Sequence, residues 1–100
     1  MVEFNKVEAF EWDKGNLEHI KKHGVDYMEC ENVFLNDPLI VTEDDKHSGA
    51  EKRYRVYGKT NRDRYLTIII TMRGGRIRVI SARDQGKKER KEYLKKGGVN

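Results

Sequence analysis

Apolar residues in the first third of the chain recur at the three- and four-residue spacing that is typical of helices. A capping residue, Asp13, precedes one such stretch, and Gly24 follows it at a position suited to end a helix. Asp26 precedes a second stretch, and Glu29 is placed to complete a capping box with it. The apolar residues are Leu17 and Ile20 in the first stretch and Tyr27, Cys30, Val33 and Phe34 in the second. The pattern predicts two short N-terminal helices, the first over 14–23.

After Leu39 the spacing of apolar residues changes from helical to alternating, as expected on entering a sheet. Polar connections that contain glycine or asparagine separate four alternating segments, and connections this short favour antiparallel neighbours. A shorter alternating segment at 9–12 could also start a strand. The four longer segments cover 39–42, 53–57, 64–72 and 76–83. The pattern therefore predicts an α+β fold with a four-stranded, mostly antiparallel sheet.

The C-terminal part of the chain is strongly basic. The segment 85–96 is compatible with a helix, but Tyr93 and Leu94 are nearly its only apolar residues, so this helix is expected to be weakly held or to contact something else. Ten basic and three acidic residues in 73–100 give a local charge of +7, whereas residues 1–72 carry −3. Clustered positive charge is typical of a site for a polyanion such as RNA, although a solvated basic helix has the same composition. The residues expected to contact RNA phosphates are Lys22, Arg55, Arg76, Arg78, Lys87, Lys88 and Arg90.

Length and composition favour one small domain. The chain has 100 residues, of which 36% are hydrophobic and 38% charged, so we expect a single domain over 1–100 with its core at about 9–96. No apolar run approaches the roughly 18 residues of a membrane-spanning helix, and no signal peptide is recognisable. The single cysteine, Cys30, excludes an internal disulfide and suits a reducing compartment. We therefore expect a cytoplasmic protein without membrane contact.

Metal and nucleophile chemistry has little support in the sequence. His19 and His23 have the i, i+4 spacing of metal ligands, but two ligands leave a site incomplete, so roles on the helix surface or in capping are favoured. Cys30 lies in an apolar stripe and is interpreted as a small core residue. An acidic cluster resembles a hard-cation site but lacks the spacing of a calcium loop, so a solvated turn of a hairpin is favoured: Glu43, Asp44, Asp45 and His47. We expect no metal and no cofactor.

The remaining side chains are of the types that cleave RNA without metal. Such cleavage needs a base for the 2′-hydroxyl proton, cations for the scissile phosphate and an acid for the leaving oxygen. Arg53 and Arg83 are candidate phosphate clamps, His23 and Glu89 are candidate proton carriers, and Tyr93 is a candidate proton donor or stacking residue. Structural roles explain the same residues: cross-strand ion pairs for the arginines, a helix salt bridge for Glu89, and a core anchor for Tyr93.

Several motifs occur in an order that resembles a known toxin family. The run RIRVISAR at 76–83, followed by Glu89, Arg90 and Tyr93, is similar to the signature of BrnT-type toxins of bacterial type II toxin–antitoxin systems. Further matching motifs lie upstream: FEWD at 10–13, KHGV at 22–25, VF at 33–34, DPL at 37–39 and EKRYRVYG at 51–58. The resemblance covers residues 10 to 94 approximately.

The resemblance implies a RelE-like fold and an endoribonuclease that arrests translation without a cofactor. It also implies a cognate antitoxin, whose complex with the toxin represses its own operon, so that DNA is contacted only through that complex. His23, Arg53, Arg83, Glu89 and Tyr93 fall on motif positions of the family.

Three hypotheses for function follow from the residues and the resemblance. The first is a metal-independent endoribonuclease toxin that uses the five motif residues for cleavage. The second is a module of the same fold that binds RNA or a partner without catalysis. The third is an interaction protein whose basic surface docks an acidic segment of an antitoxin.

Overall fold

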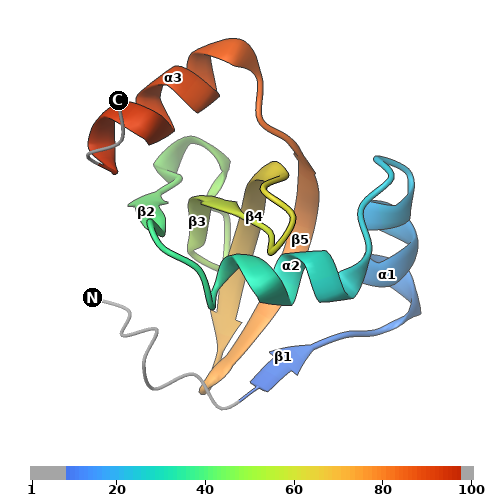
Figure 1. The fold of residues 1–100 in the computed structure, drawn as a ribbon. Helices are drawn as coiled ribbons and strands as arrows, with labels where there is room; N and C mark the ends of the chain where they lie inside the picture. Colours follow the sequence, from blue (N-terminus) through green and yellow to red (C-terminus); the bar gives the residue numbers. More distant parts are fainter. Residues whose placement is uncertain (1–8, 98–100) are drawn as a thin grey trace.

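The computed structural model describes residues 9–97 as three helices and a five-stranded sheet (Figure 1). The elements in chain order are β1 (Ala9–Glu11), α1 (Lys14–Lys21), α2 (Tyr27–Val33), β2 (Ile40–Glu43), a short 3-10 helix η2 (Asp45–His47), β3 (Arg53–Lys59), β4 (Tyr65–Arg73), β5 (Arg76–Asp84) and α3 (Lys87–Lys96). The predicted α+β class, both N-terminal helices and the basic C-terminal helix are confirmed. No helix among these residues is long and apolar enough to cross a membrane.

The sheet has the order β1-β5-β4-β3-β2, and all pairs are antiparallel except β1 with β5. The predicted number of four strands is therefore wrong, because the short segment at 9–12 forms a fifth, parallel edge strand. β1 has only three residues and pairs with a strand more than 60 positions away, so no hairpin connection indicates the partner. The remaining four strands form the expected antiparallel meander.

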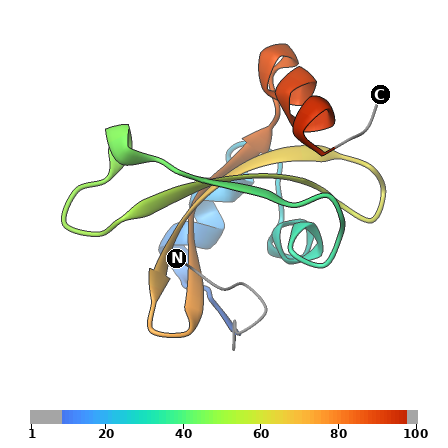
Figure 2. The same cartoon turned by 90° about the vertical axis from the view of Figure 1, so that its left-hand side faces the viewer.

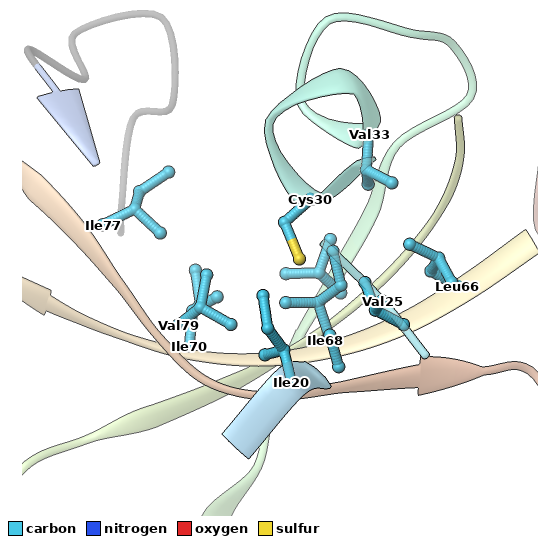
Figure 3. Close-up of a cluster of buried hydrophobic side chains, with 11 residues drawn as sticks. Ile20, Val25, Cys30, Val33, Leu66, Ile68, Ile70, Ile77 and Val79 are labelled. Atoms are coloured by element: carbon cyan, nitrogen blue, oxygen red, sulfur yellow. The ribbon is translucent and has the colours of Figure 1, made fainter. Parts of the chain in front are cut away.

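The helices lie on opposite sides of the sheet. Figure 2 shows α3 on one side and α1 and α2 on the other. The side with α1 and α2 holds the hydrophobic core (Figure 3). Alternation along each strand directs every second apolar side chain into this core. Its buried members are Ile20, Val25, Cys30, Val33, Val56, Leu66, Ile68, Ile70, Ile77, Val79 and Ala82.

Capping interactions define where the first two helices begin. The Asp13 carboxylate accepts from the Asn16 backbone N–H at 3.0 Å, and the Asn16 side chain accepts from the Asp13 N–H at 2.7 Å. Asp26 and Glu29 form the equivalent pair at α2, as the sequence predicted. Gly24 has a φ of +71°, a conformation that favours glycine and allows the chain to turn after α1. These contacts fix how α1 and α2 meet the sheet.

Arg64, just before β4, links the start of α2 to the end of β5. Its Nε donates to Asp84 at 2.7 Å, and its Nη1 donates to the Gly24 carbonyl at 2.8 Å and to Glu29 at 3.0 Å. These carboxylates raise the pKa of the guanidinium above its ordinary value, since they stabilise its charged form. The network ties three segments together at one end of the molecule.

Close packing also fixes the place of α2. Gly58 of β3 is buried, and a Cβ there would overlap Val33 of α2. Glycine is therefore required for the close approach of helix and strand.

The C-terminal helix is held mainly by one aromatic side chain. Tyr93 is 1% exposed, packs edge-on against Tyr65, and donates from its hydroxyl to the Pro38 carbonyl at 2.6 Å. The sequence indicated that a helix with so few apolar residues would be weakly held or contact something else. The contact is with the sheet and with the loop before β2.

Candidate nucleic-acid interface

The side of the sheet that carries α3 contains a hollow of about 210 Å³, which we call the arginine groove. Strand pairing brings its lining together, because Arg55 lies opposite Ile69 and Ile69 opposite Ser81 in adjacent strands. Residues that face each other across a ladder project from the same side of the sheet. The groove is lined by Asp44, Arg53, Arg55, Ile69, Ile80, Ser81 and Arg83.

A β-bulge shapes the centre of the groove. Ile69 pairs with Ser81 whereas Ile70 pairs with Val79, so Ile80 is an extra residue in β5. Bulges bend a strand and redirect side chains, and they are common beside functional sites. The bulge lets both Ile80 and Ser81 line the groove while Val79 and Ala82 remain in the core.

Arg83 is held in place by Glu89 of α3. Its Nη1 donates to Glu89 Oε1 at 2.5 Å and its Nη2 to Oε2 at 2.9 Å, which is a two-point contact. Glu89 also accepts from the Gly86 N–H at 2.9 Å and from the Thr67 hydroxyl at 3.1 Å. The Arg83 contact, followed by the Gly86 N–H, lowers the pKa of Glu89 from 4.5 to about 2. Glu89 is therefore ionised at neutral pH but a weak proton acceptor.

The pairing leaves Arg83 able to bind a second group. A guanidinium has five N–H donors. Glu89 takes one from each Nη atom, and the Asp84 carbonyl takes the second from Nη1 at 3.2 Å. The Nε donor and one Nη2 donor remain, and the side chain is 45% exposed. An anion in the arginine groove can use both.

Arg53 and Arg55 contribute positive charge from β3. The Arg55 guanidinium lies 3.7 Å from the Asp44 carboxylate, whose side chain is 3% exposed. In the described residues 9–97, no carboxylate lies within ion-pair distance of Arg53. The groove thus combines three arginines with one buried carboxylate that orients Arg55.

His23 and Tyr93 lie outside the arginine groove. His23 follows α1, is exposed, and has its ring 6.1 Å from that of His19. The Tyr93 hydroxyl already donates to Pro38, and burial raises its pKa to about 12. The structure therefore brings together Arg53, Arg83 and Glu89 of the five predicted catalytic residues, but not these two.

The predicted RNA-binding residues occupy three places. Arg55 lies in the groove, and the exposed Lys87 and Lys88 lie in the first turn of α3. Arg90 of α3 stacks on Tyr65 with its guanidinium carbon 4.2 Å from the ring centre. The others lie around α1 and the start of β5: Lys22 after α1, Arg76 at the β4–β5 turn, and Arg78 in ion pairs with Glu11 and Asp13.

Sequence reasoning missed two features of this surface. Asp44, assigned to a solvated acidic turn, is buried and paired with Arg55. The bulge at Ile80 had a signal in the sequence, because two consecutive apolar residues, Val79 and Ile80, interrupt the alternation in β5. A change of spacing inside a strand predicts an inserted residue.

The other candidate chemistry is not supported by the geometry. Within the part of the chain that the structure describes, no group of three or more His, Cys, Asp or Glu side chains is arranged to hold a metal ion. The side chain of His47, a member of the acidic cluster, lies outside the described residues. Cys30 is fully buried, and burial raises the pKa of its thiol to about 12, which suits a core residue.

A groove of three arginines on the sheet of an α+β domain has the charge and the donor groups that suit phosphate-rich ligands. Comparison with known families makes this assignment specific. The family model described as ribonuclease toxin, BrnT, of type II toxin–antitoxin system matches residues 12–89, and the chain belongs to this family. No match was found among curated proteins.

Proposed function

We propose that the protein is a metal-independent endoribonuclease toxin that cleaves RNA in the bacterial cytoplasm and thereby arrests translation. The proposal rests on family membership and on one observation, the convergence of Arg53, Arg55 and Arg83 in a single groove. Three cations at one phosphate stabilise the charge that grows on its oxygens during cleavage. Arginine supplies this charge together with a fixed donor geometry. In other nucleases a metal ion neutralises and orients the scissile phosphate in the same way.

Arg83 is the residue to which we assign transition-state stabilisation. Its Nε and remaining Nη2 donors can clamp two oxygens of a phosphate, because Glu89 fixes the plane of the guanidinium from the other side. Arg53 and Arg55 hold the same or a neighbouring phosphate. In this proposal Glu89 positions Arg83, and Tyr93 anchors α3, so neither transfers a proton.

A cognate antitoxin is the protein partner that family membership implies. We propose that it inhibits the toxin by placing an acidic segment in the arginine groove, since RNA phosphates and carboxylates compete for the same donors. DNA is contacted through the antitoxin in that complex.

A second function, RNA binding without catalysis, uses the same groove. The two functions differ in how they depend on guanidinium geometry: an Arg83→Lys change keeps the charge but not the two-point donors. A pure binding module would lose little RNA affinity on the Arg83→Lys change, whereas a nuclease would lose most of its cleavage activity.

The test is induced expression of the protein alone in a bacterial host, with growth and total RNA integrity as readouts. We expect growth arrest with RNA cleavage, both abolished by the double variant Arg53→Ala, Arg83→Ala. A matched double variant outside the groove, Arg62→Ala with Lys95→Ala, removes the same charge and should remain toxic. Normal growth with intact RNA at good soluble expression of the wild type would refute the proposal.

A further inference from the structure

A second hollow, of about 230 Å³, lies next to the arginine groove. It is lined by Gly15, Asn16, His19, Arg78, Val79 and Ile80. Ile80, the extra residue of the bulge, lines both hollows. The sequence assigned His19 to an incomplete metal pair or to a helix-surface role, but in the fold it lines a hollow that shares Ile80 with the arginine groove. We call this second space the histidine hollow.

Helix α1 holds His19 at this place. Asn16, three residues earlier, is 5% exposed and donates to the Glu11 carbonyl at 2.9 Å, and Ile20 is buried in the core. Both residues attach α1 to the sheet, one through β1 and one through the core. His19 lies one helical turn after Asn16 and is exposed. The buried neighbours Asn16 and Ile20 therefore fix its backbone position, while its ring is accessible to a ligand.

The arginine groove needs a proton acceptor that its own residues do not supply. Glu89 has a pKa of about 2 and both oxygens bound by Arg83, and Asp44 is buried beside Arg55. The Tyr93 hydroxyl is bound to Pro38. Imidazole is the side-chain group that accepts a proton most readily near neutral pH. His19 is the histidine that lines the neighbouring hollow.

We propose that His19 is the general base of the ribonuclease, an inference that rests on the proposed function. Its neutral imidazole takes the proton of the RNA 2′-hydroxyl, and the oxygen attacks the adjacent phosphorus. The P–O2′ bond forms as the P–O5′ bond breaks, and water gives a proton to the departing O5′. The products are a 2′,3′-cyclic phosphate end and a 5′-hydroxyl end. The imidazolium then returns its proton to solvent, so atoms and charge balance.

Charges around His19 are compatible with this role. The one charged side chain of β5 that lines the histidine hollow is that of Arg78, and its Nη1 lies 2.7 Å from Asp13 and 3.2 Å from Glu11. This pairing limits the repulsion that Arg78 would exert on a protonated ring. On α1 itself, or directly after it, the titratable groups within one helical turn are Glu18, Lys21, Lys22 and His23. Of these, His23 is in ring contact with His19.

The test is single-turnover cleavage of an RNA oligonucleotide by the purified full chain, comparing wild type with His19→Ala. We expect the variant to cleave about 10² to 10⁴ times more slowly while its affinity for the oligonucleotide changes only a few-fold. The pH profile of wild-type cleavage should contain a step that the profile of His19→Ala lacks. Added imidazole should raise the cleavage rate of His19→Ala at least about tenfold, because it can occupy the space that the histidine ring leaves.

Two further variants make the result specific. Lys21→Ala, on the same helix, should behave as wild type and shows that changes in α1 are tolerated. Normal cleavage by His19→Ala would overturn the assignment. Loss of activity that imidazole does not restore, with a pH profile of the same shape as that of the wild type, would also overturn it. Loss of activity in His23→Ala with normal cleavage by His19→Ala would overturn it in favour of His23. A wild-type protein that leaves RNA intact would instead refute the proposed function, and this inference with it.

Discussion

The contact between Glu89 and Arg83 gives a prediction about stability and its dependence on pH. Glu89→Gln removes the negative charge but keeps an oxygen that can accept from Gly86 and Thr67. A carboxyl whose pKa falls from 4.5 to about 2 on folding corresponds to about 3 kcal/mol at neutral pH. Because the Arg83 side chain is 45% exposed, solvent screening reduces the expected loss to about 1–2 kcal/mol.

The sign of the pH dependence follows from the lowered pKa. Ionised Glu89 stabilises the folded state above the ordinary pKa of 4.5, and this contribution is lost as the pH falls toward 2. Urea unfolding should therefore show Glu89→Gln about 1–2 kcal/mol less stable than wild type at pH 7. At pH 3 the difference should fall to less than half of that value.

A control on the same helix separates this effect from a general change in α3. Glu92 forms an exposed i, i+4 pair with Lys96, so Glu92→Gln should change stability much less than Glu89→Gln does at pH 7. An equal loss of stability by Glu89→Gln at pH 3 and pH 7, or no loss at pH 7, would refute the reasoning about the Arg83 contact.

Three further substitutions test how the fold positions the site, each by the urea-unfolding midpoint. Gly58→Ala places a methyl group against Val33 and should cost about 1–3 kcal/mol; an unchanged midpoint would show that α2 moves away freely. Tyr93→Phe leaves the Pro38 carbonyl without its donor and should cost about 1–2 kcal/mol, whereas no loss would mean that water replaces the hydroxyl. Arg64→Lys cannot reproduce the fork between two carboxylates and should cost about 1–2 kcal/mol; wild-type stability would show that charge alone suffices.

The antiparallel part of the fold was predictable because its signals are local. Alternation along 64–72 correctly separated the core side chains of Leu66, Ile68 and Ile70 from those on the other face. Capping residues marked both helix starts. Alternation at 9–12 indicated that a strand could start there, but its parallel pairing with β5 had no local signal, since that partner lies far along the chain.

The site was predictable where it depends on strand alternation and not where it depends on long-range packing. Arg53 and Arg55 fall on one face of β3, as alternation predicts. Arg83 reaches the same side only because the bulge at Ile80 shifts the alternation in β5, which strict alternation would not have predicted. The side of α1 that meets β5 could not be derived from spacing, so the sequence assigned His19 to an incomplete metal pair or to a helix-surface role and did not place it beside β5. The Pro38 contact of Tyr93 also depends on how α3 packs back over the sheet.

Single-turnover cleavage by Arg83→Lys measures whether the arginine groove cleaves RNA through guanidinium geometry and without a metal ion. The assay uses purified protein, a defined RNA oligonucleotide and a metal chelator, with Arg62→Lys as the matched control outside the groove. We predict that wild type and the control cleave with the chelator present. Arg83→Lys should cleave about 10² to 10³ times more slowly, while its RNA affinity stays within a few-fold of wild type. Equal cleavage by Arg83→Lys, or a wild-type activity that the chelator abolishes, would contradict this prediction.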